Sequence, residues 1–212
     1  MTEQQDIKTF DDLSGKYSTW IIKYCSAAFD WPLFLIWYTD TDENSTDRLL
    51  TYKSGEIFAI SSLTNLKTTI LSSINNLNEF ENLSSWLDNF NNLEVKENCT
   101  YDLISIANEI DKNNLDISTI EGFSNFINLY GDFINQDEKN TRLQVYVDNE
   151  LIKKTWEYYY EYIFWPRFND NEKFEAWDRP QLVIDAQKLL LKLNDIIKTF
   201  DDNIKQTEKA IC

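Results

Sequence analysis

Pairs of adjacent carboxylates are the residues of this chain best suited to acid–base chemistry. Asp11 stands beside Asp12, and Asp201 stands beside Asp202. A general acid and a general base must both reach one reacting atom. Neighbouring side chains on a helix or loop point apart, so these pairs are expected on the solvated surface. We therefore assign no catalytic role to them.

Residues 40–44 (DTDEN) begin like a calcium-binding loop. In such a loop a glycine makes the sharp turn, and a glutamate at the last position binds the ion through both carboxylate oxygens. Ser45 and Thr51 stand at these two positions. The segment is therefore predicted to be a solvated acidic hairpin loop, and no metal site is expected.

The chain contains no histidine. This removes the commonest general base, the Ser-His-Asp and Cys-His arrangements, and the usual nitrogen ligands of zinc. The four glycines stand too far apart to form a phosphate-binding loop of the usual types. Cys25 has no histidine to activate it and is predicted to be a small core residue. We expect no catalytic residue and no cofactor, so the chain is predicted not to be an enzyme.

Negative charge is concentrated in residues 79–138, where 13 acidic residues face only Lys96 and Lys112, a net charge of −11 out of −16. On segments predicted to be helical, such an acidic surface would speed encounter with a basic partner, although acidic surfaces also serve solubility alone. The acidic candidates for partner contact are Glu79, Glu81, Asp88, Glu94, Glu97, Asp102, Glu109 and Asp111.

Aromatic side chains crowd residues 156–177, which contain ten of them. They cannot all lie on one side of a helix, so some must enter the core and others must reach the surface. Tyr and Trp are enriched at the energetic centres of protein interfaces. Tyr159, Trp165 and Trp177 are therefore predicted to contact a partner. Stacking of single-stranded nucleic acid on these rings is disfavoured by the surrounding acids.

The composition predicts a folded chain with a protein partner. Its 212 residues are 42% apolar, enough for a substantial core. The net charge disfavours nucleic acid and anionic membranes as partners. The longest apolar stretch, residues 31–38, is far short of the roughly 20 residues that span a bilayer, and the first 12 residues lack the features of a signal peptide. The three cysteines, Cys25, Cys99 and Cys212, fit free thiols in a reducing compartment, so a cytoplasmic location is predicted.

A small antiparallel sheet is predicted near the N-terminus. Residues 31–38 (WPLFLIWY) are rich in strand-forming residues, and residues 49–53 and 56–60 flank Ser54-Gly55 as a hairpin. Residues 17–24 satisfy neither the strand period nor the helix period cleanly, so strand and helix both remain open there.

Helices are predicted beyond residue 61. A capping pattern at Ser118 and Glu121 precedes an apolar stripe over residues 120–134. A second helix over residues 151–164 should stop at Pro166. Pro180 should open the last and longest helix, whose apolar residues recur at spacings of four and three up to Ile204. The predicted fold class is α+β, mainly α: one domain over residues 1–212, with a β-containing part (1–60) and a helical bundle (61–212) that ends in a long C-terminal helix.

Four segments resemble immunity proteins of bacterial contact-dependent growth inhibition and related polymorphic toxin systems: FDDLSGKYSTWIIKYC, SGEIFAISSLTNLKTTIL, FSNFINLYGDFINQ and YYYEYIFWPRF. The resemblance is one of overall texture and carries over no individual residue. It implies that the chain binds and neutralises a cognate toxin domain, often a basic nuclease, by covering the toxin's active site or binding beside it.

Two other functions remain open from the sequence. One is an acidic inhibitor or DNA mimic of phage origin, which would bind a DNA-binding protein of the host. The other is a histidine-free enzyme, which would need a deep pocket with convergent carboxylates of perturbed pKa. The oligomeric state and the identity of the partner toxin are not specified by these patterns.

Overall fold

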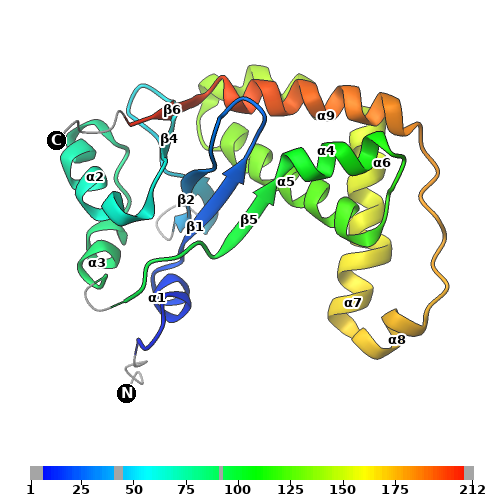
Figure 1. The fold of residues 1–212 in the computed structure, drawn as a ribbon, viewed down its shortest axis with the longest axis horizontal. Helices are drawn as coiled ribbons and strands as arrows, with labels where there is room; N and C mark the ends of the chain where they lie inside the picture. The colour runs from blue at the N-terminus through cyan, green and yellow to red at the C-terminus, as the bar shows by residue number, and fades with distance from the viewer. Residues whose placement is uncertain (1–6, 41–44, 91–92, 208–212) are drawn as a thin grey trace. The chain divides into compact units, whose positions relative to one another are not determined.

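The computed structural model describes residues 7–40, 45–90 and 93–207, and their contacts divide the chain into two compact units. The sheet unit comprises Met1–Cys25, Phe29–Thr100 and Asn203–Cys212. The helical unit comprises Ser26–Ala28 and Tyr101–Asp202. Figure 1 shows their elements, and each unit is described separately below.

The sheet has the strand order β5-β1-β2-β4-β6, with β3 paired to β2. β1 (Thr19–Cys25) and β2 (Leu33–Asp40) are antiparallel with Ile21 opposite Ile36, and β3 (Thr46–Leu49) and β4 (Ile57–Ile60) also pair antiparallel with β2. β6 (Ile204–Gln206) pairs parallel with β4, and β5 (Cys99–Asp102) lies at the other edge. β2 and β4 confirm the strands predicted at residues 31–38 and 56–60. The strand predicted at residues 49–53 is only partly present, because β3 ends at Leu49 and Thr51 forms an isolated bridge to Ile57. The segment left open at residues 17–24 is largely a strand. β5 and β6 were not predicted.

Helices of the sheet unit pack over a core that contains both strand and helix residues. They are α1 (Phe10–Tyr17), η1 (Leu63–Asn65), α2 (Leu66–Ser73), η2 (Ile74–Asn76) and α3 (Leu83–Asp88). Phe10 and the fully buried Trp86 pack with Phe90, whose ring meets that of Trp86 edge to face at 4.7 Å. Ile21 of β1 lies in this core, whereas Ile22 and Tyr24, on the opposite face of the strand, are buried as well.

The helical unit contains α4 (Leu103–Asp111), α5 (Ile117–Asn135), η3 (Glu138–Tyr146), α6 (Glu150–Tyr159), the π-helical η4 (Tyr160–Phe164), α7 (Trp165–Asn169), α8 (Asn171–Ala176) and α9 (Ala186–Asp201). The apolar stripe predicted for α5 is confirmed. Its buried rings meet α9 at Phe200, which lies 5.6 Å from Phe126 and 5.8 Å from Phe133 between ring centroids.

Three predicted helix boundaries are wrong. The helix that begins at Glu150 passes through η4 and continues to Asn169, because Pro166 falls in the first turn of α7, where a missing N–H costs no hydrogen bond. Pro180 does not open α9, which begins at Ala186 and is shorter than α5. The cap of α5 is Asp116, whose carboxylate accepts from the Thr119 N–H, and not Ser118.

The fold class is α+β and mainly α, as predicted, with a mixed rather than purely antiparallel sheet. The predicted helical part (61–212) also contributes β5 and β6 to that sheet. The prediction of one domain with a boundary at residue 60 stays a prediction. None of the described helices is both long enough and apolar enough to cross a membrane.

Candidate functional site

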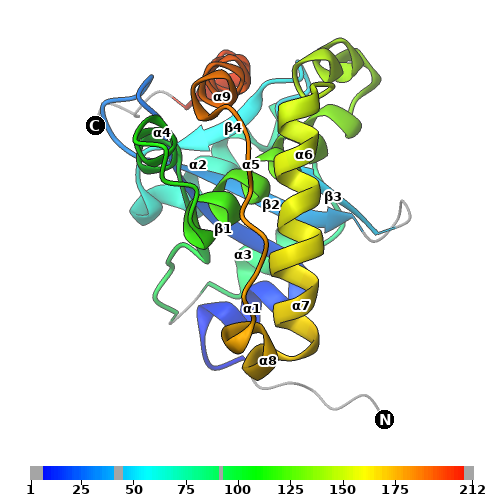
Figure 2. The ribbon, with the colours of Figure 1, turned by 90° about the vertical axis from the view of Figure 1, so that its right-hand side faces the viewer.

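An extended segment joins α8 to α9 in the helical unit. Residues 177–185, called the strap here, form no helix or strand. Figure 1 shows the strap as the orange trace from α8 to α9, and Figure 2 shows it passing between α6 and the helices α4 and α5. Two hollows border the strap, one on each side.

Local sequence explains why the strap is extended. Pro180 disfavours a helical conformation at Arg179, the residue before it. Trp177 is already extended, with φ −86° and ψ 126°. Asp185 ends the strap, because its carboxylate accepts from the Lys188 N–H and caps α9. These residues keep α8 and α9 apart as separate helices.

Side chains of α6 and α8 hold the strap on one side. The Tyr158 hydroxyl donates to the Pro180 carbonyl at 2.7 Å, and Lys154 Nζ donates to the Val183 carbonyl at 2.9 Å. The Arg179 guanidinium lies 4.1 Å from the centre of the Phe174 ring and donates to the Phe174 carbonyl at 2.8 Å. Both cations are therefore already engaged within the helical unit.

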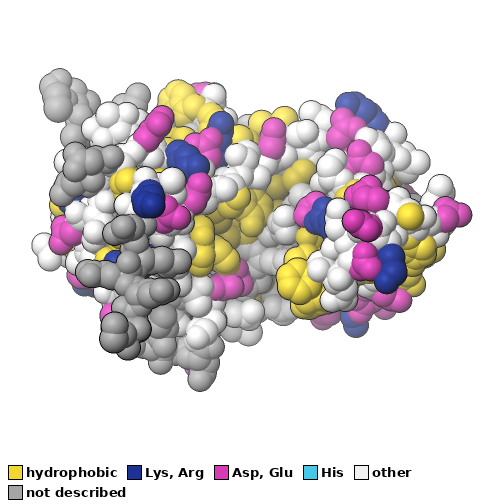
Figure 3. All heavy atoms as spheres, turned by 90° about the horizontal axis from the view of Figure 1, so that it is seen from below, with side chains coloured by type: hydrophobic (Ala, Val, Ile, Leu, Met, Phe, Trp, Pro, Cys, Tyr) yellow, Lys and Arg dark blue, Asp and Glu magenta, His cyan; other side chains and the backbone are white. Residues whose placement is uncertain are grey.

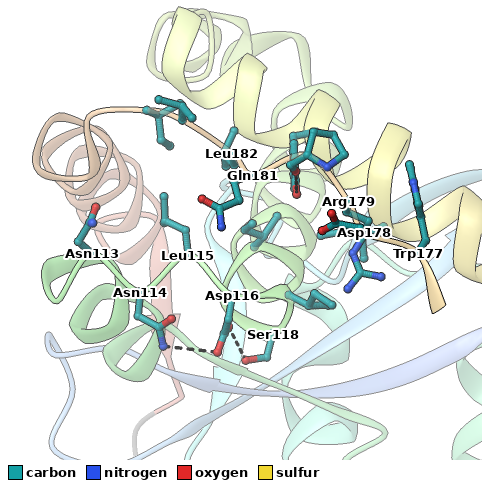
Figure 4. Close-up of a pocket in the computed structure, with 17 residues that line it drawn as sticks. Asn113, Asn114, Leu115, Asp116, Ser118, Trp177, Asp178, Arg179, Gln181 and Leu182 are labelled. Carbon is teal, nitrogen blue, oxygen red and sulfur yellow. Dashed lines mark hydrogen bonds between the residues drawn. The ribbon is translucent and has the colours of Figure 1, made fainter. Parts of the chain in front are cut away.

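The larger hollow, of about 880 Å³, lies between the strap and the turn that joins α4 to α5 (Figure 4). Its polar side chains come from Asn113, Asn114, Asp116 and Ser118 in the turn and from Asp178, Arg179 and Gln181 in the strap. Apolar side chains complete the lining: Leu115, Ile117, Ile120, Ile163 and Leu182. The hollow thus combines an apolar lining with a polar rim.

Asp116 is fixed by the helix that it caps. It accepts from the Thr119 N–H at 2.8 Å and from the Ser118 hydroxyl at 2.8 Å, and Asn114 donates to it at 3.4 Å (Figure 4, which draws the Ser118 and Asn114 bonds). The Thr119 N–H is the main reason why the pKa of Asp116 lies below its ordinary value. A general acid needs a raised pKa, so this carboxylate gives the enzyme alternative no support.

The smaller hollow, of about 310 Å³, lies on the α6 side of the strap. Its lining includes Lys154, Glu157, Tyr158, Glu161 and Tyr162. Lys154 and Tyr158 are the two residues that hydrogen-bond the strap. On this side the strap is therefore bonded directly to α6.

Aromatic residues divide between core and surface, as predicted for residues 156–177. Trp177 is 40% exposed and lies 6.0 Å from Tyr162 between ring centroids. Trp165 and Phe168 are also exposed and meet edge to face at 6.0 Å on α7. Tyr159, by contrast, is 2% exposed and packs in the core with Ile120, Ile163 and Phe174, and burial raises its pKa to about 12. Tyr159 is therefore not available for direct contact with a partner.

The acidic candidates do not share one helical surface. Glu79, Glu81, Asp88, Glu94 and Glu97 belong to the sheet unit, and Asp102, Glu109 and Asp111 belong to the helical unit. The expectation that residues 79–138 are helical throughout is wrong, since β5 lies within them. In Figure 3, acidic side chains at the right-hand end, in the helical unit, are interspersed with basic and hydrophobic ones.

Several of these acids have partners inside their own unit. Ion pairs join Glu97 to Lys23 at 3.7 Å, Asp88 to Lys67 at 3.6 Å and Glu109 to Lys112 at 2.7 Å. Asp102 caps α4, and Asp111 accepts from the Gln187 side chain. Local electrostatics and capping therefore account for part of the acidic composition. Contact of these residues with a partner stays a prediction.

The two members of each carboxylate pair have different surroundings. Asp11 and Asp12 are exposed, the first paired with Lys96 at 2.6 Å and the second capping α1. Asp201 is half-buried and accepts from the Ser26 hydroxyl, whereas Asp202 is exposed.

The other predicted chemical features lie as follows. Residues 41–44 of the calcium-like segment, and Cys212, lie outside the described residues. Cys25 is half-buried and Cys99 exposed, and neither forms a disulfide within the described residues. No group of three potential metal-ligating side chains occurs within residues 7–40, 45–90 and 93–207.

Sequence reasoning missed the turn at residues 113–118 and most of the strap. Pro180 was interpreted as a helix start, although Arg179 before it and the acidic cap Asp185 after it also fit an extended link between two helices. If Asp185 is taken as the helix cap, α9 begins only at Ala186, and the residues between Pro180 and Asp185 are predicted to be extended.

Comparison with known proteins gives a fold but no family. No family model and no curated protein sequence matches the chain. One solved structure, the C-terminal domain of SatS in complex with bromine, is similar, with a TM-score of 0.57 and 10% sequence identity. The match covers 92% of this chain and 97% of that chain. At this identity the likeness concerns the fold alone.

Proposed function

We propose that the chain is an immunity protein, which binds a basic bacterial toxin domain and neutralises it. The observation that carries the proposal is the set of exposed aromatic rings on the helical unit. Trp177 lines the larger hollow, and Trp165 and Phe168 expose large rings on α7. Exposed rings of this size are costly in water and are typical of the centres of protein interfaces.

Charge supports a basic partner. The chain carries a net charge of −16, and the Asp178 carboxylate at the rim of the larger hollow has no cation of its own unit bonded to it. Arg179, the one guanidinium in the same lining, lies over Phe174. The resemblance to immunity proteins supplies the class of partner, a toxin domain. The cytoplasm, where such a toxin would act, is the proposed location.

Co-expression tests this proposal directly. The polypeptide encoded immediately upstream is the candidate toxin, and its toxic domain should arrest growth of a bacterial host when expressed alone. Co-expression of the present chain should restore growth and give a complex that survives gel filtration. Because opposite charges steer the encounter, the association rate should fall steeply as salt is raised. A chain that leaves growth arrested and elutes separately at low salt contradicts the proposal.

A pair of tryptophan variants locates the interface. Trp177→Ala should weaken the complex about fivefold or more, because truncation of an interface ring costs more than about 1 kcal/mol. Trp31→Ala is the matched control: its side chain is 49% exposed, against 40% for Trp177, but it lies in the sheet unit. Calorimetric titration measures both. Equal losses for the two variants would place the interface elsewhere.

A further inference from the structure

The strap carries backbone groups without partners along one edge. The N–H groups of Leu182, Val183 and Ile184 donate no hydrogen bond within the described part of the chain, and the carbonyls of Leu182 and Ile184 accept none. Main-chain groups of this kind are satisfied by water or by a second extended chain. The strap thus has the bonding capacity of an unpaired strand.

Side-chain burial along the strap follows the period of a strand. Leu182 and Ile184 are half-buried, whereas Gln181, Val183 and Asp185 are exposed, Val183 by 77%. Alternation of this kind means that the strap lies flat on the helical unit with one side covered. The backbone N–H and C=O groups at its two edges therefore point sideways, parallel to the surface of the helical unit.

The hydrogen bond from Lys154 identifies the edge of the strap that faces α6. In an extended chain the N–H and C=O of one residue point to the same edge, and those of its neighbours point to the opposite edge. The Val183 carbonyl faces Lys154 on α6. The Pro180 carbonyl, which bonds to Tyr158 of α6, precedes the stretch of alternating burial that begins at Gln181. Within residues 181–185, Leu182 and Ile184 therefore direct their four main-chain groups away from Lys154, and both residues line the larger hollow. The two residues are about 6.6 Å apart along the chain, the repeat of a β-ladder.

The lining of the hollow specifies the side chains of an incoming segment. Asp178 and Asp116 bring two carboxylates, while Arg179 is engaged with Phe174, so the hollow favours a cation. The lining also includes apolar side chains of the turn and of α5, which favour an apolar residue at the alternate position. A strand places alternate side chains on opposite sides, so both preferences can be met at once.

We propose that the partner adds an extended segment to the open edge of the strap at Leu182 and Ile184, and that this segment alternates apolar and basic side chains. The inference rests on the proposed function in that it assigns the docking segment of the same protein partner. Main-chain hydrogen bonds would supply much of the affinity, and the rim carboxylates the preference for basic residues.

A titration with defined peptides tests the inference without the toxin. The full-length chain, labelled with ¹⁵N, is titrated with a blocked hexapeptide of alternating Lys and Val. The same experiment is run with alternating Glu and Val and with alternating Lys and Gly. The Lys-Val peptide should bind at least about fivefold more tightly than either and should slow amide exchange at Leu182 and Ile184 more than at Val183. Equal binding of the Lys-Gly peptide, or protection confined to other segments, overturns the inference.

Proline variants test the edge itself, because proline removes one N–H from a chain that is already extended. Ile184→Pro should abolish binding of the Lys-Val peptide, and Val183→Pro, whose N–H faces α6, should leave it within about twofold. Amide spectra of both variants confirm that they are folded. Unchanged binding by Ile184→Pro, or loss of binding by a folded Val183→Pro, overturns the proposed edge.

Two variants that each remove one negative charge provide a further test. This test does not depend on whether the proline variants fold. Asp178→Asn should weaken the Lys-Val peptide about two- to fivefold, as expected for one exposed charge contact. Asp30→Asn, an equally charged change at an exposed site of the sheet unit, should leave binding unchanged. Equal effects of the two variants contradict the assigned site.

The two proposals fail in different ways. If the peptide binds as described but the chain does not restore growth, the docking edge stands and the toxin proposal fails. If growth is restored equally well by Ile184→Pro, the toxin proposal stands and the docking edge fails.

Discussion

Asp116 connects the candidate site to the stability of the helical unit. Its carboxylate accepts from the Thr119 N–H, one of the backbone donors that the first turn of α5 leaves without an intrahelical partner. The same residue lines the larger hollow. One side chain therefore both starts the longest described helix and contributes to the rim of the site.

Removal of this cap should destabilise the chain measurably. Asp116→Ala is expected to lower the free energy of unfolding by about 0.5–2 kcal/mol, the usual cost of a lost N-cap. Asp116→Asn should retain most of the stability, because an amide oxygen can accept the same hydrogen bond. Urea unfolding at pH 7 measures both variants. An alanine variant as stable as the asparagine variant would show that the cap contributes nothing.

Phe174 shows how one ring can organise a short segment. Two guanidiniums lie over it, that of Arg179 at 4.1 Å from the ring centre and that of Arg167 at 6.0 Å. Arg167 also forms an ion pair with Glu121 of α5. The ring thus joins the start of the strap to α5 and α7 through cation–π contacts and one ion pair. The beginning of the strap is fixed at this point, while its middle borders both hollows.

At the scale of the element, α9 illustrates a helix whose stability comes from packing. Ala186, Leu189, Leu193, Ile196 and Phe200 form its buried stripe, and Leu191 lies on the opposite, solvent side. Isolated helices of this length are marginal in water, so the buried stripe must supply most of the stabilisation. Two leucines of the same helix, only two positions apart, therefore have very different energetic roles.

Alanine substitution should separate these roles. Leu193 is completely buried, and Leu193→Ala is expected to cost about 2–5 kcal/mol because it leaves a cavity. Leu191 is 64% exposed, so Leu191→Ala should change the free energy of unfolding by less than about 0.5 kcal/mol. Both variants have the same helix propensity. Chemical denaturation compares them, and similar losses would contradict the assigned orientation of α9.

The elements that the sequence predicts well are those with one strong period. The stripe of α5 is the clearest example, because its apolar residues keep a consistent spacing from Ile120 to Ile134. β2 is predicted by another local signal, its continuous run of strand-forming residues. The short strands β5 and β6 have only 4 and 3 residues, too few to establish a period. They form because neighbouring strands offer unpaired edges, which is tertiary information. The same limit applies to the strap, which is defined by the helices beside it.

Proline was the least reliable local signal. Pro166 was expected to stop a helix and lies inside one, because the π turn before it places it at the start of a new α-helical segment. Pro180 was expected to start a helix and lies in the strap. In both cases the residue restricts its own φ angle and removes one donor, and the surrounding contacts decide the outcome.

For the whole molecule, net charge and local carboxylate contacts act in opposite directions as pH falls. Protonation of the many acids relieves the self-repulsion of a chain with net charge −16. Hydrogen bonds and ion pairs nevertheless hold the pKa values of several carboxyls below their ordinary values of 3.8 and 4.5, among them Asp12, Asp116, Asp170, Asp185 and Glu109. These contacts stabilise the folded state only while the carboxyls are ionised.

Acid should therefore destabilise the chain. A carboxyl with a lowered folded pKa binds its proton more readily when unfolded, so its contribution is complete above the ordinary pKa and is lost as pH falls through the folded value. We expect the urea midpoint to change little between pH 7 and 5 and to fall steadily below pH 4.5. The measurement requires dilute protein, because the pI is about 4.3. A midpoint that rises continuously to pH 3 would show that charge repulsion dominates instead.

The parallel pairing of β4 with β6 has a consequence for synthesis on the ribosome. β4 ends at Ile60 and β6 begins at Ile204. One edge of β4 therefore cannot pair with β6 until the intervening residues have been translated. At elongation rates of about 5–20 residues per second this interval is roughly 7–30 s. During that time the nascent chain presents an open, apolar strand edge, the kind of surface that chaperones protect and that aggregates when unprotected. Slow translation should therefore lower the yield of soluble chain.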